Sequence, residues 1–305
     1  MPHGRAAPDQ TDRVKLGGTG IWSAALRYGD PGEIADAAAE LEQLGYSALW
    51  PPGGIGGPIF DTCASLLDAT TQVVVAPGIV NVWMHDPAEV AAAHTRLVGA
   101  HPGRFLLGLG VSHQPLVDHD APGRYRAPLA VMDRYLDELD AATPPVPRPE
   151  RLLAALGPRM LDLARRRSAG AHPYLVTPEH TAQARAALGA AALLAPEQAV
   201  VVERDASVAR GIARQHLAIY LQLPNYARNW ERLGFDAADA ADGGSDRLVD
   251  ALVAWGDVDA IAARVEEHRA AGADHVCIQA LATDVRALPR AARCSPWSNL
   301  DIRYP

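Results

Sequence analysis

The chain has 305 residues, 49% of them hydrophobic, and a formal net charge of −8. This length is enough for one large core. The chain is acidic and its longest basic run, Arg165 to Arg167, is short, so its overall field does not attract nucleic acid or anionic membranes. Its three cysteines are far apart and form no CxxC pair, which argues against a disulfide framework and against a zinc site. No segment has the apolar length of a membrane span, and the N-terminus lacks the apolar core of a signal peptide, so we expect a cytoplasmic protein.

Short apolar runs rich in β-branched residues alternate with Ala-rich amphipathic runs along the chain. The expected strands begin at Val14, Tyr46, Gln72, Arg104, Arg151, Ala171, Leu193 and Ala273. The expected helices between them cover residues 31–45, 60–70, 87–100, 129–141, 158–167 and 178–189. Eight strands in regular alternation with helices predict an α/β protein with the (β/α)8 TIM-barrel fold. An open doubly wound sheet is the alternative, but the stretch GGTGIW after the first strand lacks the GxGxxG spacing typical of that fold.

The connection between the seventh and eighth expected strands is much longer than the others. Its sequence predicts a helical insertion at about residues 205–256, with a loop DAADAADGGSD that is followed by two further helices. We expect a single barrel domain at 14–293, a disordered N-terminal lead at 1–13 and an irregular tail at 294–305.

The carboxyl ends of barrel strands form the rim where active sites lie. The residues expected there are rich in Trp, Gly and neutral polar groups and poor in carboxylates, which suits a flat conjugated ligand better than a metal ion. We expect Trp22, Trp50 and Trp83 to contact the substrate. His113 follows the fourth strand and is a candidate proton donor, although a histidine bonded to backbone is the commoner case. The histidines form no HxH or HExxH pattern, and no GxSxG occurs, which argues against metal-dependent and serine hydrolases.

The stretch ALGPRMLDLA indicates an anion site. Gly157 ends the fifth expected strand, and Pro158 can be the first residue of the helix that follows. The free N–H groups of Arg159 and Met160, with the helix dipole, would then face an anion, and the Arg159 side chain could add charge. An ordinary turn with its Gly and Pro explains the same sequence.

Four stretches together resemble the bacterial luciferase-like superfamily of flavin and deazaflavin enzymes. AHPGRFLLGLGVSHQPLV is similar to its PGRF-x-LGLG signature, and VVVAPGIVNVWMHDPAEVAAA is similar to its third strand and following helix. LGPRMLDLA with SAGAHPYLVTPEH resembles its fifth and sixth units, and GDVDAIAARVEEHRAAGADHVCIQAL its close. The likeness covers residues 14–281 and is nearest to the probable F420-dependent oxidoreductases.

The resemblance implies a bulge in the third strand, with a non-prolyl cis peptide bond at Gly78–Ile79 that backs the cofactor ring and with Asn81 facing the ring edge. It also implies that the turn from Gly157 through Pro158 and Arg159 to Met160 holds the cofactor phosphate. Ser112, His113 and Thr177, which follow the fourth and sixth strands, complete the expected cofactor contacts. Many F420-dependent relatives carry an Asp-His pair after the second strand, where this chain has WPPGGIGG, so His113 is the expected catalytic group by elimination.

Three functions remain open from the sequence. The first is an oxidoreductase that uses coenzyme F420 for hydride transfer to or from a small organic substrate. The second is an FMN-dependent monooxygenase of the same fold, and the third is an inactive, cofactor-free barrel that acts as a binding protein. The resemblance further implies a homodimer, and no metal is expected.

Overall fold

The computed structural model describes residues 14–119 and 121–281, so the expected N-terminal lead, the tail from 294 and Cys294 lie outside the described residues. The strands are β1 (Thr19–Trp22), β2 (Ala48–Trp50), β3 (Val74–Val75), β4 (Val80–Asn81), β5 (Leu107–Gly110), β6 (Arg151–Leu153), β7 (Gly170–Ala171), β8 (Leu193–Leu194), β9 (Glu197–Val202), β10 (Val253–Gly256) and β11 (Val276–Ala280). The helices of the first six units are α1 (Pro31–Gln43), α2 (Ile59–Asp68), α3 (Pro87–Ala100), α4 (Gln114–Val117), α5 (Pro128–Ala141), α6 (Pro158–Arg167) and α7 (Pro178–Leu188). The remaining helices are α8 (Ala206–Leu217), α9 (Pro224–Arg232), α10 (Ala237–Ala240), α11 (Asp246–Leu252) and α12 (Val258–Ala270), with short 3-10 turns η2 (Ala24–Leu26), η3 (Arg148–Glu150) and η4 (Tyr220–Gln222).

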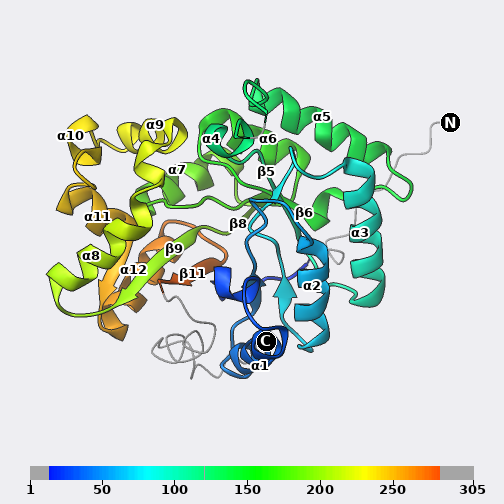
Figure 1. Ribbon diagram of the computed structural model, residues 1–305, viewed down its shortest axis with the longest axis horizontal. Coiled ribbons are helices and arrows are strands. Elements are labelled where there is room, and N and C mark those ends of the chain that lie inside the picture. The colour runs from blue at the N-terminus through cyan, green and yellow to red at the C-terminus, as the bar shows by residue number, and fades with distance from the viewer. Residues whose placement is uncertain (1–13, 120, 282–305) are drawn as a thin grey trace.

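All strand pairs are parallel and form two sheets, in the orders β10-β9-β11-β1-β2-β3 and β4-β5-β6-β7-β8. Two chain segments belong to both sheets, because residues 74–81 contain β3 and β4, and residues 193–202 contain β8 and β9. Figure 1 shows the helices arranged around these strands. The TIM-barrel fold class predicted from the sequence is confirmed by this order and by the structural neighbours reported below.

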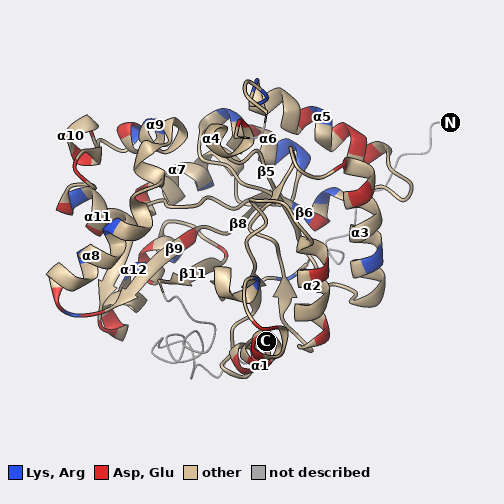
Figure 2. Ribbon diagram, viewed as in Figure 1, with Lys and Arg blue, Asp and Glu red and all other residues tan. Residues whose placement is uncertain are grey.

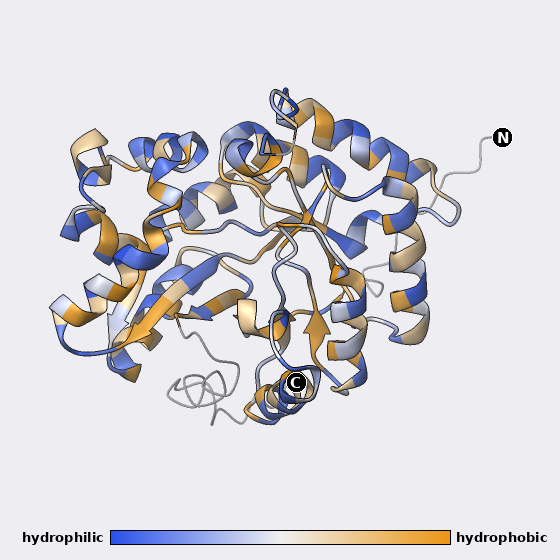
Figure 3. Ribbon diagram, in the orientation of Figure 1, coloured by the Kyte–Doolittle hydropathy of each residue, from blue (hydrophilic) through white to orange (hydrophobic). Residues whose placement is uncertain are grey.

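The interior of the barrel is a separate apolar cluster. Its members alternate along the strands, and they include Ala48, Trp50, Val74, Ala76, Leu106, Leu152, Ala169, Ala195 and Cys277. A larger cluster fills the space between the strands and the surrounding helices. The strands are accordingly the most hydrophobic part of Figure 3, while the charged residues of Figure 2 lie mainly on the helices.

The connection after β9 differs from its prediction. One helix, α11, follows the DAADAADGGSD loop, and then the chain forms β10, which pairs with β9 from Val253↔Ala199 to Gly256↔Val202. The two further helices expected there are thus α11 and α12 with a strand between them. The sequence did not indicate β10, because a run of four residues between two helical patterns is too short to show the periodicity of a strand. The helices from α8 to α11 lie together on one side of the strands (Figure 1), and they share a core that includes Leu217, Trp230 and Leu248.

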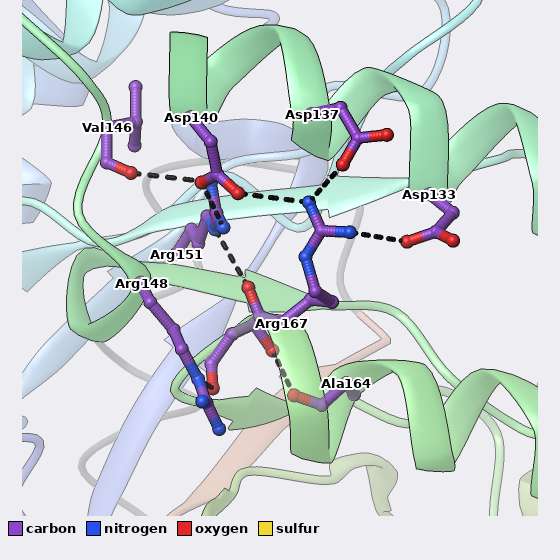
Figure 4. Close-up of polar contacts among 9 residues, drawn as sticks. Asp133, Asp137, Asp140, Val146, Arg148, Arg151, Ala164 and Arg167 are labelled. Atoms are coloured by element: carbon purple, nitrogen blue, oxygen red, sulfur yellow. Dashed lines mark hydrogen bonds and ion pairs between the residues drawn. The ribbon is translucent and has the colours of Figure 1, made fainter.

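The amino ends of β6 and its neighbours are joined by an arginine-aspartate network (Figure 4). Arg167, at the end of α6, contacts three carboxylates of α5, those of Asp133, Asp137 and Asp140. Arg151 is 1% exposed; its Nη2 lies 2.7 Å from Asp140, and its Nε donates to the carbonyl of Arg167 at 2.9 Å. Two guanidinium groups therefore join α5, β6 and α6 at the end of the barrel opposite the rim.

Candidate active site

The third strand is interrupted between β3 and β4, and this interruption shapes the rim. The peptide bond Gly78–Ile79 is cis, as predicted. Trp22 donates from its indole Nε1 to the carbonyl of Gly78 at 3.1 Å, so the end of β1 holds the interruption from one side. Gly78, Ile79 and Trp22 are all half-buried, and they therefore contribute surface to the rim.

Two glycines of β5 make room for the interruption. A Cβ atom on Gly108 would lie 2.1 Å from the carbonyl oxygen of Pro77, and one on Gly110 would lie 2.6 Å from the Ile79 side chain. Backbone can approach this closely only where no side chain intervenes. The LGLG stretch is thus the sequence signal for the shape of its neighbour, and sequence reasoning did not use it in that way.

An aromatic wall continues from Trp22 across the rim. The ring centroids of Trp22 and Tyr174 are 5.6 Å apart, and those of Tyr174 and Tyr220 are 5.5 Å apart. The Tyr220 hydroxyl donates to the Tyr174 hydroxyl at 3.2 Å, and the Tyr174 hydroxyl donates to Oε1 of Gln279 at 2.8 Å. The wall therefore combines residues from the ends of three barrel strands with one residue of η4.

Trp50 does not belong to this surface. It is fully buried in the barrel interior, where it stacks on His172 at 4.5 Å and 17° and donates to Nε2 of His275 at 3.2 Å. The expected substrate contact is therefore not possible in this conformation. The strand was identified correctly, but its last residue points into the barrel instead of onto the rim.

Asn81 and Trp83 fix the loops that surround the rim. Asn81 is fully buried; its Nδ2 donates to the carbonyl of Gly54 at 2.9 Å, and its Oδ1 accepts from the N–H of Trp83 at 3.0 Å. Its amide is thus used to hold the glycine-rich loop after β2. Trp83 is half-buried, and its indole donates to the carbonyl of Val111 at 2.8 Å.

His113 lies at the rim against the insertion. Its ring centroid is 5.5 Å from that of Tyr226 and 6.5 Å from that of Tyr220. Burial lowers the pKa of His113, and a hydrogen bond with the Asn225 side chain partly opposes this shift, so the ring is mainly neutral at neutral pH. Ser112 precedes it with a φ of 53°, in the left-handed region, and this conformation directs the chain from β5 into α4.

Helix α6 begins where the sequence predicted, but only one of the two N–H groups expected to be free for an anion is free. Gly157 is the N-cap and Pro158 the first helical residue. The Met160 N–H, expected to be free for an anion, donates instead to the carbonyl of Gly157 at 3.1 Å. Arg159 is exposed and is the second residue of the helix, so its N–H remains the expected donor of this turn.

A different arginine lies at this turn, and sequence reasoning missed it. Nη2 of Arg232, the last residue of α9, is 3.6 Å from the position that a Cβ on Gly157 would take, and it donates to Oδ1 of Asn229 at 3.2 Å. Asn229 is 1% exposed, and its Nδ2 has no hydrogen-bond partner within the described residues. The insertion thus brings a positive charge and an unpaired donor to the start of α6, which no local pattern in the sequence indicates.

Thr177 and His180 support the same corner. Thr177 is buried as the N-cap of α7, and its hydroxyl accepts from the N–H of His180 at 3.4 Å. Nε2 of His180 lies 2.9 Å from the carbonyl of Leu156, just before the turn. These bonds hold the beginnings of α6 and α7 together, so in this structure Thr177 acts as a helix cap.

The described part of the chain offers neither a metal centre built from several side chains nor a membrane-spanning helix. No group of three or more His, Cys, Asp or Glu side chains there is arranged to hold a metal ion. Among the same residues, no helix is both long and apolar enough to cross a bilayer.

Comparisons with known proteins identify the family and the fold of the chain. The sequence model of the luciferase-like monooxygenase family matches residues 15–275. An F420-dependent secondary alcohol dehydrogenase, solved with an F420–acetone adduct, has a TM-score of 0.72 at 14% identity over 94% of this chain and 100% of its own. A coenzyme F420-dependent tetrahydromethanopterin reductase from Methanopyrus kandleri has a TM-score of 0.71 at 16% identity, over 93% of this chain and 98% of its own.

A third solved structure carries a different cofactor. The oxygenating constituent of 3,6-diketocamphane monooxygenase from Pseudomonas putida, in complex with FMN, has a TM-score of 0.60 at 14% identity over 87% of this chain and 92% of its own. No curated protein matches the chain by sequence. At these identities the solved structures show a shared fold, and the family match spans most of the chain. The chain therefore belongs to the luciferase-like monooxygenase family, whose members are enzymes.

Proposed function

We propose that the protein is an oxidoreductase that uses coenzyme F420 for hydride transfer to or from a small organic substrate. The observation that carries this proposal is the combination, on one rim, of an anion-binding turn at Gly157 with an aromatic surface around Trp22. Flavin and deazaflavin cofactors combine a phosphate with a flat ring, and such a rim offers a partner to each.

The residues present suit such a cofactor. The Arg159 N–H, the positive end of α6 and the Arg232 guanidinium would hold the phosphate. Trp22, Gly78 and Ile79 would contact the ring. When bound, the deazaflavin supplies the hydride, and the protein supplies position, hydrogen bonds and proton transfer.

His113 stays a proposed contact of the ring or the substrate. It is mainly neutral, so it offers a hydrogen bond and not a charge. Its contacts with Tyr220 and Tyr226 hold it in place from the insertion.

An FMN-dependent monooxygenase is the second candidate. It is favoured by the neighbour whose structure contains FMN, while two neighbours with higher TM-scores are described as F420-dependent. We also propose, from the family resemblance, a cytoplasmic homodimer; sedimentation of the purified protein tests the dimer.

The experiment is a fluorescence titration of the purified protein with oxidised coenzyme F420 and, separately, with FMN. Tight binding of F420 alone supports the proposal, and preference for FMN replaces it by the monooxygenase. Binding of neither by the folded protein would refute both and favour the cofactor-free barrel.

A matched pair of variants tests the anion site. Arg232→Ala is expected to weaken cofactor binding by about 10- to 100-fold, the worth of one charge-assisted hydrogen bond to a phosphate. Arg228→Ala, an exposed arginine on the same helix, is expected to leave it within about twofold. Equal effects of the two substitutions would show that only the general charge of α9 matters.

A further inference from the structure

Gln279 lies on the inner face of β11, at the floor of the rim. Along this strand, Cys277 belongs to the barrel interior and Ile278 to the layer between strands and helices, so Gln279 faces inward again. The pairing Gly20↔Cys277 places Gln279 at the level of Trp22, since each lies two residues further along its strand. The glutamine amide is therefore a neighbour of the half-buried Trp22 side chain, which also packs on the interior cluster.

The two atoms of the Gln279 amide differ in what they bind. Its Oε1 accepts from the Tyr174 hydroxyl at 2.8 Å, and the Tyr174 oxygen accepts in turn from the Tyr220 hydroxyl at 3.2 Å. Because both hydroxyl protons point along this chain towards Oε1, the NH2 group of the amide is turned away from it. Nε2 has no hydrogen-bond partner among the described residues, and unlike the unpaired Nδ2 of Asn229 it is not fully enclosed. The floor thus offers an uncommitted neutral donor next to an aromatic surface.

The described side chains that surround this donor are mainly uncharged at neutral pH. Burial raises the pKa of Tyr174 well above its ordinary value, so this residue stays a phenol. Glu197 pairs with Cys277 one level below, and burial raises the pKa of Glu197 to about 8. Burial lowers the pKa of His172 to about 4. A charged substrate group would lose its hydration at this floor without gaining a counter-charge.

We propose that Gln279 selects the substrate by donating a hydrogen bond from Nε2 to an uncharged carbonyl oxygen, while a flat apolar group of the substrate lies against Trp22. The substrate class is a small aromatic or conjugated aldehyde or ketone, and carboxylates are rejected. This inference rests on the proposed function. Gln279 touches the substrate, and Tyr174 is a positioning residue, because its hydroxyl fixes the orientation of the amide.

The tyrosine hydroxyls of the wall are less suited to this role. The protons of Tyr220 and Tyr174 are both engaged within the chain, so neither can donate to a ligand unless a hydrogen bond is broken. Their oxygens can accept, but a ketone has no polar proton to give. A carbonyl compound would complete the hydrogen bonding at Gln279 and leave the chain of hydroxyls intact.

The first test compares three probes on the wild-type protein with its cofactor bound. Acetophenone carries a ring and a carbonyl oxygen, ethylbenzene has the same ring without an oxygen, and benzoate carries a negative charge. Equilibrium dialysis is expected to show acetophenone binding about 2- to 10-fold more tightly than ethylbenzene, the worth of one neutral hydrogen bond. Benzoate should bind at least about 10-fold more weakly than acetophenone. Infrared difference spectra with a 13C-labelled carbonyl should show the C=O band of bound acetophenone at lower frequency than in water-free solvent.

The second test changes the amide. Gln279→Met keeps the length of the side chain and removes the donor, so acetophenone should bind no better than ethylbenzene, and ethylbenzene should bind within about twofold of the wild type. Gln222→Met, at an exposed glutamine in η4, is the matched control and should keep the preference. Tyr174→Phe frees Oε1 and lets the amide turn, so the shift of the carbonyl band should become smaller although Nε2 is still present. A merely structural role of Tyr174 would leave that shift unchanged.

The outcomes separate this inference from the cofactor assignment. An unshifted carbonyl band, equal binding of benzoate and acetophenone, or a preference that survives Gln279→Met would overturn the role of Gln279 while the cofactor assignment stands. Binding of neither cofactor refutes the proposed function, and the same three probes are then measured on the cofactor-free protein. A preference for acetophenone that Gln279→Met removes would still support the donor; equal affinities, or no binding of any probe, would overturn it.

Discussion

The two ends of the barrel differ in whether their buried polar and charged groups are paired. At the amino end, Arg151 and Arg167 are paired with the carboxylates of α5 (Figure 4). At the rim and in the interior below it, Asn229, His172 and Glu197 are buried with at least one polar atom unpaired among the described residues. Paired charges hold elements in one arrangement, whereas unpaired polar atoms cost stability and persist where a site uses them. The amino end is therefore expected to determine stability, and the rim binding and proton transfer.

The largest effect is expected at the amino end, from Arg151→Met. Its buried guanidinium satisfies Asp140 and the carbonyl of Arg167, and its loss should lower the free energy of unfolding by about 2–4 kcal/mol. Urea unfolding measures this, with Arg96→Met as the control. Arg96 pairs with Asp61, but the two side chains are 60% and 73% exposed, so the control should cost less than about 1 kcal/mol. Similar losses of unfolding free energy in the two variants would contradict the expected difference between the buried arginine and the exposed one.

Gly108→Ala tests whether the rim depends on close backbone packing. The added methyl group would collide with the carbonyl of Pro77, and the strain should cost about 1–3 kcal/mol and weaken cofactor binding. Gly99→Ala in α3 is the control, because open space surrounds it and the change should stabilise the helix by about 0.5–1 kcal/mol. A stable Gly108→Ala protein with normal cofactor binding would show that the interruption of strand three is not held from β5.

The pH dependence of stability should come from the rim and the interior. Burial raises the pKa of Glu197 from 4.5 to about 8, so its contribution to stability is fully present below 4.5 and is lost as pH rises through about 8. Glu197→Gln should therefore flatten the alkaline decline in unfolding free energy, by on the order of 1–2 kcal/mol. Burial lowers the pKa values of His172 and His275 to about 4, so their contribution has the opposite sign: it is present above 6.5 and is lost as pH falls through about 4. An alkaline decline unchanged in Glu197→Gln would contradict this assignment.

The smallest effect is expected for Trp22→Phe. This change removes the indole hydrogen bond to the carbonyl of Gly78 but keeps an aromatic ring, and it should cost about 1 kcal/mol in urea unfolding. Cofactor affinity should fall more clearly than stability, since the rim and not the core is altered. A larger loss of stability than of cofactor affinity would show that Trp22 belongs to the core and not to the rim.

Local chemistry was sufficient to predict much of the fold. The alternation of strands and helices gave the fold class, and Gly157 with Pro158 gave the start of α6. Properties that depend on distant parts of the chain could not be predicted in this way. Whether Trp50 points into the barrel is set by strand tilt, and the place of Arg232 is set by how the insertion packs. Glu197 was not assigned a role from the sequence, because only burial distinguishes it from a solvated carboxyl.

The α9 helix touches both parts of the proposed site. Near its start, Tyr226 packs against His113, and at its end Arg232 reaches Gly157. Six residues of helix separate them, a rise of about 9 Å. In the proposed site, the helix would therefore set the distance between the ring contact and the anion contact, and it would favour ligands whose ring and anionic group are separated by a matching span. Lengthening or shortening α9 by one turn would change the size of the preferred ligand without altering any residue that contacts it.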